Sequence, residues 1–396
     1  MTTQANILTT LAYGIESTFG TAASAGAGKY LRRVSSSLNL AKEGFASREM
    51  RVDQQLSDFR HGGRRGAGTI EGELSLTTWD DILLALLRGS AWTAGVAKSN
   101  TEFTNVASDS GTSKFTVGGS TWAAQGFKVG DVIRFTNLAT TANNSKNFRI
   151  TALSGVDATV TPAPATGTAD TSFNVVVAGY KGVNGTSKYS FTFEQNYPDI
   201  DISEQFLGSR VGGASIRLPP NNMASIAAEV MAQDVAILSG ASAPYFTAPT
   251  AETSTSVFSG VKGNLSIGGA VSAVVTGAEL GINLGLSATP VIGSQIVPDI
   301  YYGRTIVTGQ VSAYLEGVSL INAFLNESDI DLAMVMELPG TDPLDFMSFV
   351  MNKINLTGVS KTISAEGGVI ATFPFQAILN SGTGYDTTTM SIQKSI

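Results

Sequence analysis

Residues 69–76 read Thr69-Ile-Glu-Gly-Glu-Leu-Ser-Leu76, and residues 306–313 read Ile306-Val-Thr-Gly-Gln-Val-Ser-Ala313. In both stretches apolar or small residues alternate with polar ones, which is the two-residue period of a strand with one buried face. Gly72 aligns with Gly309 when the two stretches are superposed. Each stretch is therefore predicted to be a strand, and their likeness indicates an internal duplication.

A short apolar run follows each of these strands. Asp80 and Asp81 supply acids for a first helical turn, and the apolar run that follows them ends before Gly89, so residues 78–88 are predicted to be a helix. With a one-residue slip, residues 81–87 align with residues 319–325, which have near-helical apolar spacing. The repeated unit therefore comprises a strand, a turn and a helix.

Other strands are predicted between and after these units. Alternating patterns occur at residues 188–194 and 224–232. Residues 97–182 are rich in Thr, Ser, Ala and Asn and separate the first helix from these strands. Within them, residues 126–135, 147–152 and 158–162 predict three strands of a small barrel or sandwich, with a long decorated hairpin as the alternative.

The predicted fold class is mainly β, with two related β-sandwich or barrel domains, each with a short flanking helix, and an inserted small all-β domain. The 396 residues are enough for these three domains, each with its own core. The expected boundaries are 1–96 with 183–245 for the first domain, 97–182 for the insert, and 246–396 for the second domain.

The composition restricts the chemistry of the chain. Only 14% of the residues are charged, against about 25% in typical domains, which favours a surface covered by other protein. There is no cysteine and a single histidine, His61, so disulfides, iron–sulfur clusters and thiolate zinc sites are excluded and no cofactor is expected.

Charge is distributed unevenly along the chain. Counting Lys and Arg against Asp and Glu gives a net charge of +1 for residues 1–94, +2 for residues 95–182 and −10 for residues 183–396. Proteins that grip nucleic acid are usually basic, because phosphate neutralisation drives binding. The acidic C-terminal half therefore indicates a chain that repels DNA.

No export signal and no membrane span are predicted. The N-terminal residues lack a basic segment followed by a continuous apolar run, so synthesis in the cytoplasm is expected. Residues 266–284 form the most apolar later stretch, but several glycines and Glu279 interrupt it.

Several short segments of the chain, and the order in which they occur, resemble those of bacteriophage major tail tube proteins of the long, non-contractile tail type. No single segment is diagnostic, and the likeness covers about residues 7–94 and 183–380. The segments are Ala12-Tyr-Gly-Ile-Glu-Ser-Thr-Phe-Gly-Thr21, Ala46-Ser-Arg-Glu-Met-Arg-Val-Asp53, Gly68-Thr-Ile-Glu-Gly-Glu-Leu-Ser75, Val275-Thr-Gly-Ala-Glu279, Val291-Ile-Gly-Ser294, Pro298-Asp-Ile300 and Val307-Thr-Gly309.

The resemblance implies a structural virion protein. Its strands would join those of neighbouring subunits into a barrel around a bore, and stacked rings would form the tube through which DNA leaves the capsid without being bound specifically. Rings of this family contain six tube domains, so a duplicated chain would need three copies, with a ring of six chains as the alternative. The implied partners are further copies of the chain, the tape measure protein, and the tail terminator and distal tail proteins, with no membrane.

Two connections are candidates for contacts between rings or subunits. The connection 41–68 is too long for a simple hairpin loop and is rich in charge, so it is expected to be an arm whose arginines pair with acids of a neighbour. A solvated loop is the alternative, and interleaved acids disfavour DNA binding. The shorter connection 290–304 is expected to play the same part. The candidate residues are Arg48, Arg51, Asp53, Asp58, Arg60, Arg64, Arg65, Asp299, Tyr301 and Arg304.

Two pairs of acids are candidates for a bore-facing acidic ladder. Asp199 with Asp201, and Asp329 with Asp331, are two residues apart, which on a strand places both carboxylates on one face. The same spacing suits a pair of calcium ligands, but neither pair lies in a glycine-centred ligand loop, so a metal site is disfavoured.

Catalysis is not expected. Asp80 and Asp81 suit the start of a helix better than a pair of catalytic carboxylates, and no phosphate-binding glycine loop is present. An alternative function is an adhesive or carbohydrate-binding surface protein, suggested by the Thr- and Asn-rich residues 97–182 with Trp122 and Phe127. A hydrolase is a third possible class, but only scattered acidic residues could serve as its catalytic groups.

Overall fold

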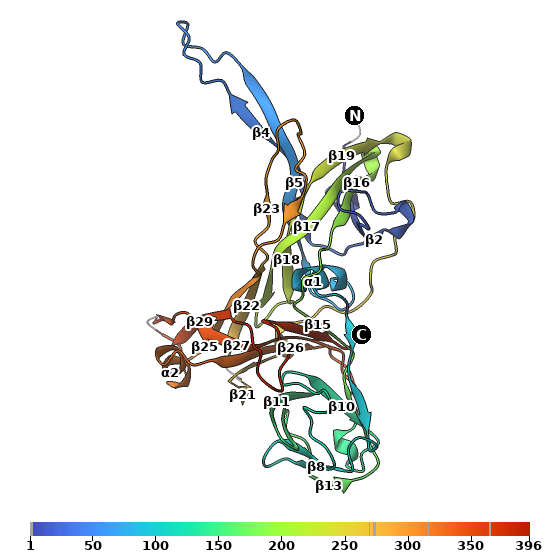
Figure 1. The fold of residues 1–396 in the computed structure, drawn as a ribbon, viewed down its shortest axis with the longest axis vertical. Coiled ribbons are helices and arrows are strands. Elements are labelled where there is room, and N and C mark those ends of the chain that lie inside the picture. Colours follow the sequence, from blue (N-terminus) through green and yellow to red (C-terminus); the bar gives the residue numbers. More distant parts are fainter. Residues whose placement is uncertain (1–2, 269, 272–274, 316, 364–365) are drawn as a thin grey trace.

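The computed structural model describes residues 3–268, 270–271, 275–315, 317–363 and 366–396. Strands dominate it, which confirms the mainly β prediction. Figure 1 shows an upper body that extends a long hairpin, a flatter body beside it, and a lower body formed by the middle of the sequence. We call these the first unit (residues 10–94 and 180–239), the second unit (residues 263–396) and the insert (residues 97–177).

The strands of the first unit come from both sides of the insert. They are β1 (Thr10–Ile15), β2 (Lys29–Tyr30), β3 (Ser35–Ser36), β4 (Asn39–Ala46), β5 (Phe59–Glu73), β6 (Thr93–Ala94), β15 (Tyr180–Val183), β16 (Phe191–Tyr197), β17 (Ile202–Leu218), β18 (Ser225–Ala232) and β19 (Asp234–Ser239).

The long strand β17 belongs to two sheets. Residues 202–209 pair with β16 and residues 202–207 with β19, while residues 210–217 pair with β18, which continues to β5. The strand bends between these parts at Gly208, whose positive φ of 57° suits glycine. The two parts of β17 therefore form two layers with the hydrophobic core between them.

The second unit repeats much of this arrangement. Its strands are β20 (Gly263–Ile267), β21 (Ala270–Val271), β22 (Val275–Asn283), β23 (Ser287–Ala288), β24 (Ile300–Tyr301), β25 (Ile306–Tyr314), β26 (Ile330–Glu337), β27 (Phe346–Leu356), β28 (Ser360–Thr362), β29 (Ile370–Ala377) and β30 (Ser391–Lys394).

The central strand pairings of the two units correspond. The neighbours β3–β5–β18–β17–β16 of the first unit are matched by β22–β25–β29–β27–β26 in the second, all antiparallel. In addition, β1 pairs with β16 as β20 pairs with β26. Because pairings far apart in sequence are repeated in the same order, the structure supports the duplication inferred from residues 69–76 and 306–313.

In the part of the chain that the structure describes, each unit carries one short α-helix, at the predicted place. Helix α1 (Asp80–Leu87) follows β5, and α2 (Ser319–Leu325) follows β25. All residues of α1 from Ile82 to Leu87 are buried, and the Trp79 indole Nε1 before it donates to the carbonyl of Glu73 at 3.0 Å. No described residue of α2 is buried. Helix α1 is therefore packed into the core, whereas α2 stays partly exposed.

The insert forms a separate eight-stranded sheet in the order β13-β8-β9-β12-β11-β10-β14-β7. Its core is rich in aromatic residues and is distinct from that of the two units. The strands are β7 (Ala97–Ser99), β8 (Val106–Asp109), β9 (Lys114–Val117), β10 (Val132–Thr136), β11 (Phe148–Ser154), β12 (Asp157–Thr161), β13 (Gly167–Asp170) and β14 (Asn174–Val177).

The insert leaves the first unit but rests on the second. The side chain of Gln393 in β30 donates to the carbonyls of Val132 and Ala178 at 2.9 and 2.7 Å and accepts from the Val132 amide at 2.9 Å. Val132 and Ala178 also form a small apolar cluster with Phe346 of β27. Lys181 lies between Asp131 and Asp386 and pairs with both. The C-terminal strand therefore ties the insert to the second unit.

Two sequence expectations differ in detail. Only the end of residues 126–135 is a strand, and the strand predicted at 188–194 begins at Phe191. The apolar stretch 266–284 lies partly outside the described residues, and its described part includes β22. No described helix has the length and apolar character needed to cross a membrane.

Candidate assembly surfaces

The connection 41–68 is a hairpin arm. Strands β4 and β5 pair from Asn39 with Ala67 to Ala46 with Phe59, and the hairpin extends well beyond the first unit (Figure 1). Phe45 and Phe59 each lie against a glycine of the opposite strand, Gly62 and Gly44, where a Cβ would clash with the ring. Because glycine has no side chain, the aromatic rings of Phe45 and Phe59 lie flat on the opposite strand. The two-stranded arm is therefore thin.

Charged residues near the arm tip pair with one another. Arg51 Nη2 lies 3.0 Å from Asp53 Oδ2, and Arg60 Nε lies 2.9 Å from Asp58 Oδ2. The hydrogen bond from Arg51 lowers the pKa of Asp53 below its ordinary value. Arg48 is exposed nearby. These four residues therefore pair within the chain, and the contact of the arginines with acids of a neighbour stays a prediction.

The tip of the arm also exposes apolar side chains. Met50, Val52 and Leu56 lie between residues 47 and 58, and all three are largely exposed. His61 is exposed on β5 with its ring edge-on to Phe59. Exposed apolar groups gathered at the end of a projecting arm are typical of an interaction site. The sequence of this segment points to its charged residues, and nothing in it marks these three apolar residues as a group.

The base of the arm is tied to the rest of the chain. Arg64 Nε lies 2.6 Å from Asp234 Oδ1 of β19, and the Arg64 amide donates to the carbonyl of Gln295 at 2.8 Å. Arg65, the next residue, is exposed. The structure thus places Arg64 at an internal contact between the arm and the connection 290–304.

The connection 290–304 is likewise held by the first unit. Asp299 Oδ1 pairs with Nη2 of the buried Arg210 at 2.8 Å, and the Arg210 guanidinium lies over the ring of Tyr302. Tyr301 and Arg304 are exposed. This connection and the arm lie side by side and point the same way in Figure 1.

The two acid pairs lie apart from each other. Asp199 is in a 3-10 turn (Pro198–Ile200) and accepts from the Ala5 amide, and Asp201 follows that turn, so the strand argument does not apply to this pair. Asp329 pairs with Lys353 at 2.9 Å, and Asp331 lies 4.0 Å from the buried Arg149. Asp329 and Asp331 line a cleft of about 530 Å³ beside the insert.

A different set of acids shares one face of a continuous sheet. In one cross-strand row, residues lie opposite one another in the order Glu73, Ser225, Arg217, Glu279, Gln310 and Pro374. The next row along the same face runs Glu71, Ala227, Ser215, Gly281, Thr308 and Gln376. Glu229 belongs to the third row. We call this surface the polar face.

The polar face has a negative charge balance. Glu71, Glu73, Glu229 and Glu279 oppose the single basic side chain of these rows, Arg217, which pairs with Glu279 at 2.9 Å. The alternation at residues 69–76 places Glu71 and Glu73 on one strand face but gives them no role. Only the pairing of distant strands brings Glu229 and Glu279 beside them.

The aromatic residues that suggested glycan binding are not on a surface. Trp122 and Phe127 are fully buried in the core of the insert, with ring centroids 4.9 Å apart. They serve the packing of that sheet and are not exposed for stacking on a glycan, so the Thr- and Asn-rich composition alone is left behind the adhesive alternative. Within the described residues, no group of three or more histidine or acidic side chains could hold a metal ion.

A family model described as phage tail tube protein matches residues 7–377. The chain belongs to the phage tail tube protein family. This confirms the resemblance drawn from the order of the short sequence segments. Members of this family are structural components of the phage tail, so the chain is a virion protein of a structural family rather than of an enzyme family. No curated protein matches the chain.

Proposed function

We propose that this tail tube protein polymerises into stacked hollow rings, and that the stack is the conduit for DNA ejection. The observation that carries this proposal is the polar face, because it belongs to one sheet that runs through both units. Strand pairing is an efficient way to extend such a sheet between subunits. A ring built from it would have a continuous inner wall.

Three chains per ring is the stoichiometry we propose. The first domain would comprise residues 1–96 and 183–245, the insert residues 97–182, and the second domain residues 246–396. The repeated pairings around β17 and β27 support two tube domains in each chain. Three copies would then supply the six domains that the resemblance implies. A ring of six chains, each with one tube domain, is the competing arrangement.

We propose that the polar face lines the bore. Glu71, Glu73, Glu229 and Glu279 would give it a negative potential, which repels the phosphates of DNA and prevents specific binding during passage. Small and polar neighbours such as Ser215 and Thr308 leave no aromatic platform on which bases could stack. The pairs Asp199 with Asp201 and Asp329 with Asp331 remain further candidates for acids facing the bore.

We propose that the arm and the connection 290–304 contact the next ring. Both point the same way, so a ring would present three long and three short projections on one side. The exposed Arg48, Arg65, Tyr301 and Arg304 would join the apolar tip residues in this contact. Because Arg51 and Arg60 already have partners in the arm, the contact would owe more to apolar burial than to ion pairs.

Other tail proteins are proposed partners at the ends and inside the tube. These are the tape measure protein within the bore and the tail terminator and distal tail proteins at the two ends. We propose no cofactor, no enzymatic step and no membrane contact for this function.

Electron microscopy of the purified protein at rising concentration tests the proposal. Stacked hollow rings are expected, and three-dimensional averaging would count the chains in each ring. A protein that stays monomeric at every concentration would contradict the tube function, whereas rings of six chains would contradict only the stoichiometry.

A further inference from the structure

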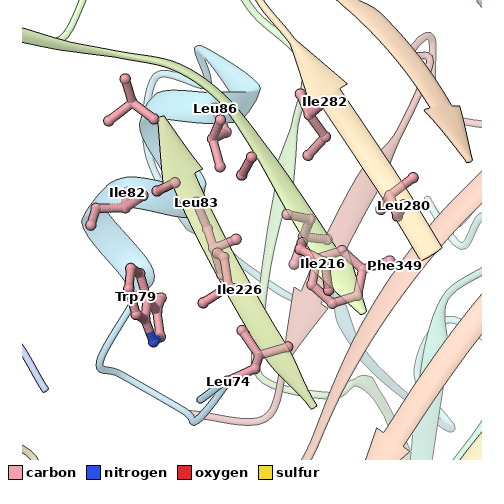
Figure 2. Close-up of a cluster of buried hydrophobic side chains, with 14 of the residues drawn as sticks. Leu74, Trp79, Ile82, Leu83, Leu86, Ile216, Ile226, Leu280, Ile282 and Phe349 are labelled. Atoms are coloured by element: carbon pink, nitrogen blue, oxygen red, sulfur yellow. The ribbon is translucent and has the colours of Figure 1, made fainter. Parts of the chain in front are cut away.

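The contact between the two units within one chain is a complete strand junction. Residues Gly213–Leu218 of β17 pair antiparallel with Ala278–Asn283 of β22, with Ile216 opposite Leu280. Helix α1 lies over this junction, and Figure 2 shows Leu83 and Leu86 in the same buried cluster as Leu280. The first unit thus contributes β17 and α1, and the second unit contributes β22.

The first unit has its own equivalent of β22 in β3, and among the described pairings only β5 lies beside it. Leu280 lies opposite Gly309 in β25, and Gly309 corresponds to Gly72 in β5. The register of β3 with β5, in which Ser36 lies opposite Ile70, places Val34 opposite Gly72. Val34 is therefore the counterpart of Leu280. However, Val34 is 71% exposed, while Leu280 is 0% exposed.

The second unit has its own equivalent of β17. Ile216 lies opposite Ile226 in β18, and Leu356 of β27 lies opposite Phe375 in β29, the counterpart of Ile226. Leu356 is therefore the counterpart of Ile216. On the other edge of β27, the pairing with β26 ends at Ile354, so within the described pairings no strand lies beside Leu356 on that edge.

Helix α2 lacks the cover that α1 has. Leu83 and Leu86 of α1 correspond to Ile321 and Phe324 of α2, which are only half-buried, and Leu325 at the end of α2 is 69% exposed. Figure 1 places α2 at the outer end of the second unit. Three features therefore have no described partner: the apolar side of α2, the edge of β27 at Leu356, and the side chain of Val34. At the junction inside the chain, the counterpart of each is buried.

We infer that the ring closes by a copy of this internal junction between successive chains. Beyond its pairing with β26, the end of β27 of one chain pairs antiparallel with the edge at Val34 of the next, with Leu356 opposite Val34, and α2 covers the new pair as α1 covers the internal one. This inference rests on the proposed ring and names its subunit contact. The contact is head-to-tail, because the two surfaces differ and lie on different units, so it propagates until the ring closes.

An engineered disulfide tests the register. The chain has no cysteine, so a Val34→Cys, Leu356→Cys variant has no background thiols. Opposed residues in antiparallel strands have Cα atoms about 4.5–5.5 Å apart, within the range of disulfides. Mild oxidation of assembled protein should therefore give covalent dimers and trimers on a denaturing gel, and a reducing agent should return all of it to monomer.

Two control pairs make the result interpretable. An Arg217→Cys, Glu279→Cys variant places cysteines opposite each other in the internal junction and should cross-link only within a chain. Val34→Cys with Ile237→Cys, an exposed residue of β19, should give no covalent trimer. Rings seen by microscopy without covalent trimers from Val34→Cys, Leu356→Cys would overturn the inference but leave the tube function intact. Absence of rings in the unmodified protein would instead contradict the proposed function.

Charge substitutions at the two open surfaces give a second test that needs no oxidation. Val34→Glu should block one surface and Leu325→Glu the other, and because both residues are exposed, each variant should fold as a monomer with an unchanged melting temperature. When the two variants are mixed, the intact surface of each should pair once and then stop, giving a 1:1 dimer by light scattering. Rings from either variant alone, or a mixture that stays monomeric, would overturn the inference.

Discussion

The carboxylate of Glu16 accepts a hydrogen bond from the amide of Gly208 at 2.8 Å, at the bend of β17. The same carboxylate accepts from the Gly20 amide at 3.0 Å and from the Thr192 hydroxyl at 2.9 Å. Glu16 thus fastens the N-terminal segment to the place where β17 passes from one sheet to the other. Glu16→Ala leaves these buried donors unpaired and should lower the free energy of unfolding by about 3 kcal/mol, as measured by denaturant titration.

The pH dependence of stability provides a separate test of Glu16. Burial raises the pKa of Glu16 above its ordinary value of 4.5, although the hydrogen bonds from Gly208 and its other donors act in the opposite direction. The folded chain therefore holds this proton more tightly than the unfolded chain. The resulting stability is present below pH 4.5 and is lost as the pH rises through the folded pKa.

Glu16→Gln should remove that pH dependence while keeping one acceptor oxygen. Melting temperatures of the wild type and the variant between about pH 4 and 7 provide the measurement. The stability of the wild type relative to the variant should fall as the pH rises. A difference that is constant across this range, or that grows with pH, would contradict the assignment.

Equivalent positions in the two units should respond differently to truncation. Leu280→Ala removes a buried side chain at the internal junction and should cost about 2–5 kcal/mol of folding free energy. Val34→Ala should change monomer stability by less than about 0.5 kcal/mol but raise the concentration needed for assembly. Denaturant titration and analytical sedimentation measure the two effects. A large loss of monomer stability from Val34→Ala would show that this edge is covered within the chain.

Gln393 should hold the insert on the second unit. Gln393→Ala leaves the amide and carbonyl of Val132 and the carbonyl of Ala178 without their side-chain partner, at a cost of about 2–3 kcal/mol. Hydrogen exchange at residues 129–134 should become faster, while β17 should be unaffected. Gln376→Ala, an exposed glutamine of β29, is the matched control and should leave both regions unchanged.

The charge of the polar face should control the affinity of the tube for DNA. Tubes of the wild type are expected not to retain DNA at physiological salt, whereas Glu71→Lys with Glu229→Lys should retain it and release it as salt rises. A fluorescent DNA fragment and purified tubes provide the assay. Glu252→Lys with Asp109→Lys reverses two exposed acids outside that sheet and should have no such effect. Equal retention by both double variants would argue against this face as the bore wall.

The apolar tip of the arm should be needed for stacking but not for ring closure. Met50→Ser, Val52→Ser and Leu56→Ser together should leave single rings and abolish long tubes in micrographs. Ile7→Ser, another exposed apolar residue, is the control and should not shorten the tubes. Normal tubes from the triple variant would contradict a role for the tip.

The arginines of the arm provide a comparison with the apolar tip. Neutralising Arg60, Arg64 and Arg65 together should impair stacking more than folding, with a modest loss of stability from the ion pair of Arg64 with Asp234. Tube length that is unchanged in this variant would eliminate the arginines as contact residues.

Local patterns predicted the parts of the fold that depend on near neighbours. The helices at residues 78–88 and 319–325 follow from a short apolar run with a clear end. The strand predicted at residues 69–76 follows from alternation, and β5 ends within that range, at Glu73. The internal repeat was visible because Gly72 and Gly309 both lie in strands closely packed on their neighbours. These features need no knowledge of what each strand pairs with.

Contacts between distant segments were not predictable in this way. Nothing near Arg64 in the sequence points to Asp234, and nothing near Glu71 points to Glu229, because both relationships depend on strand register. Likewise, the sequence around Trp122 and Phe127 is compatible with a binding surface, but in the fold both side chains lie in the core of the eight-stranded sheet. The long-range order of pairing therefore decides which charged and aromatic residues remain available for assembly.

The protein is proposed to build a tube from rings whose inner wall is the sheet shared by the two units. Three-dimensional averaging of the purified assemblies by electron microscopy is the decisive measurement. We expect stacked hollow rings of three two-lobed chains, with Glu71 and Glu229 facing the bore and α2 against the next chain. A persistent monomer, or rings whose bore is lined by another surface, would contradict it.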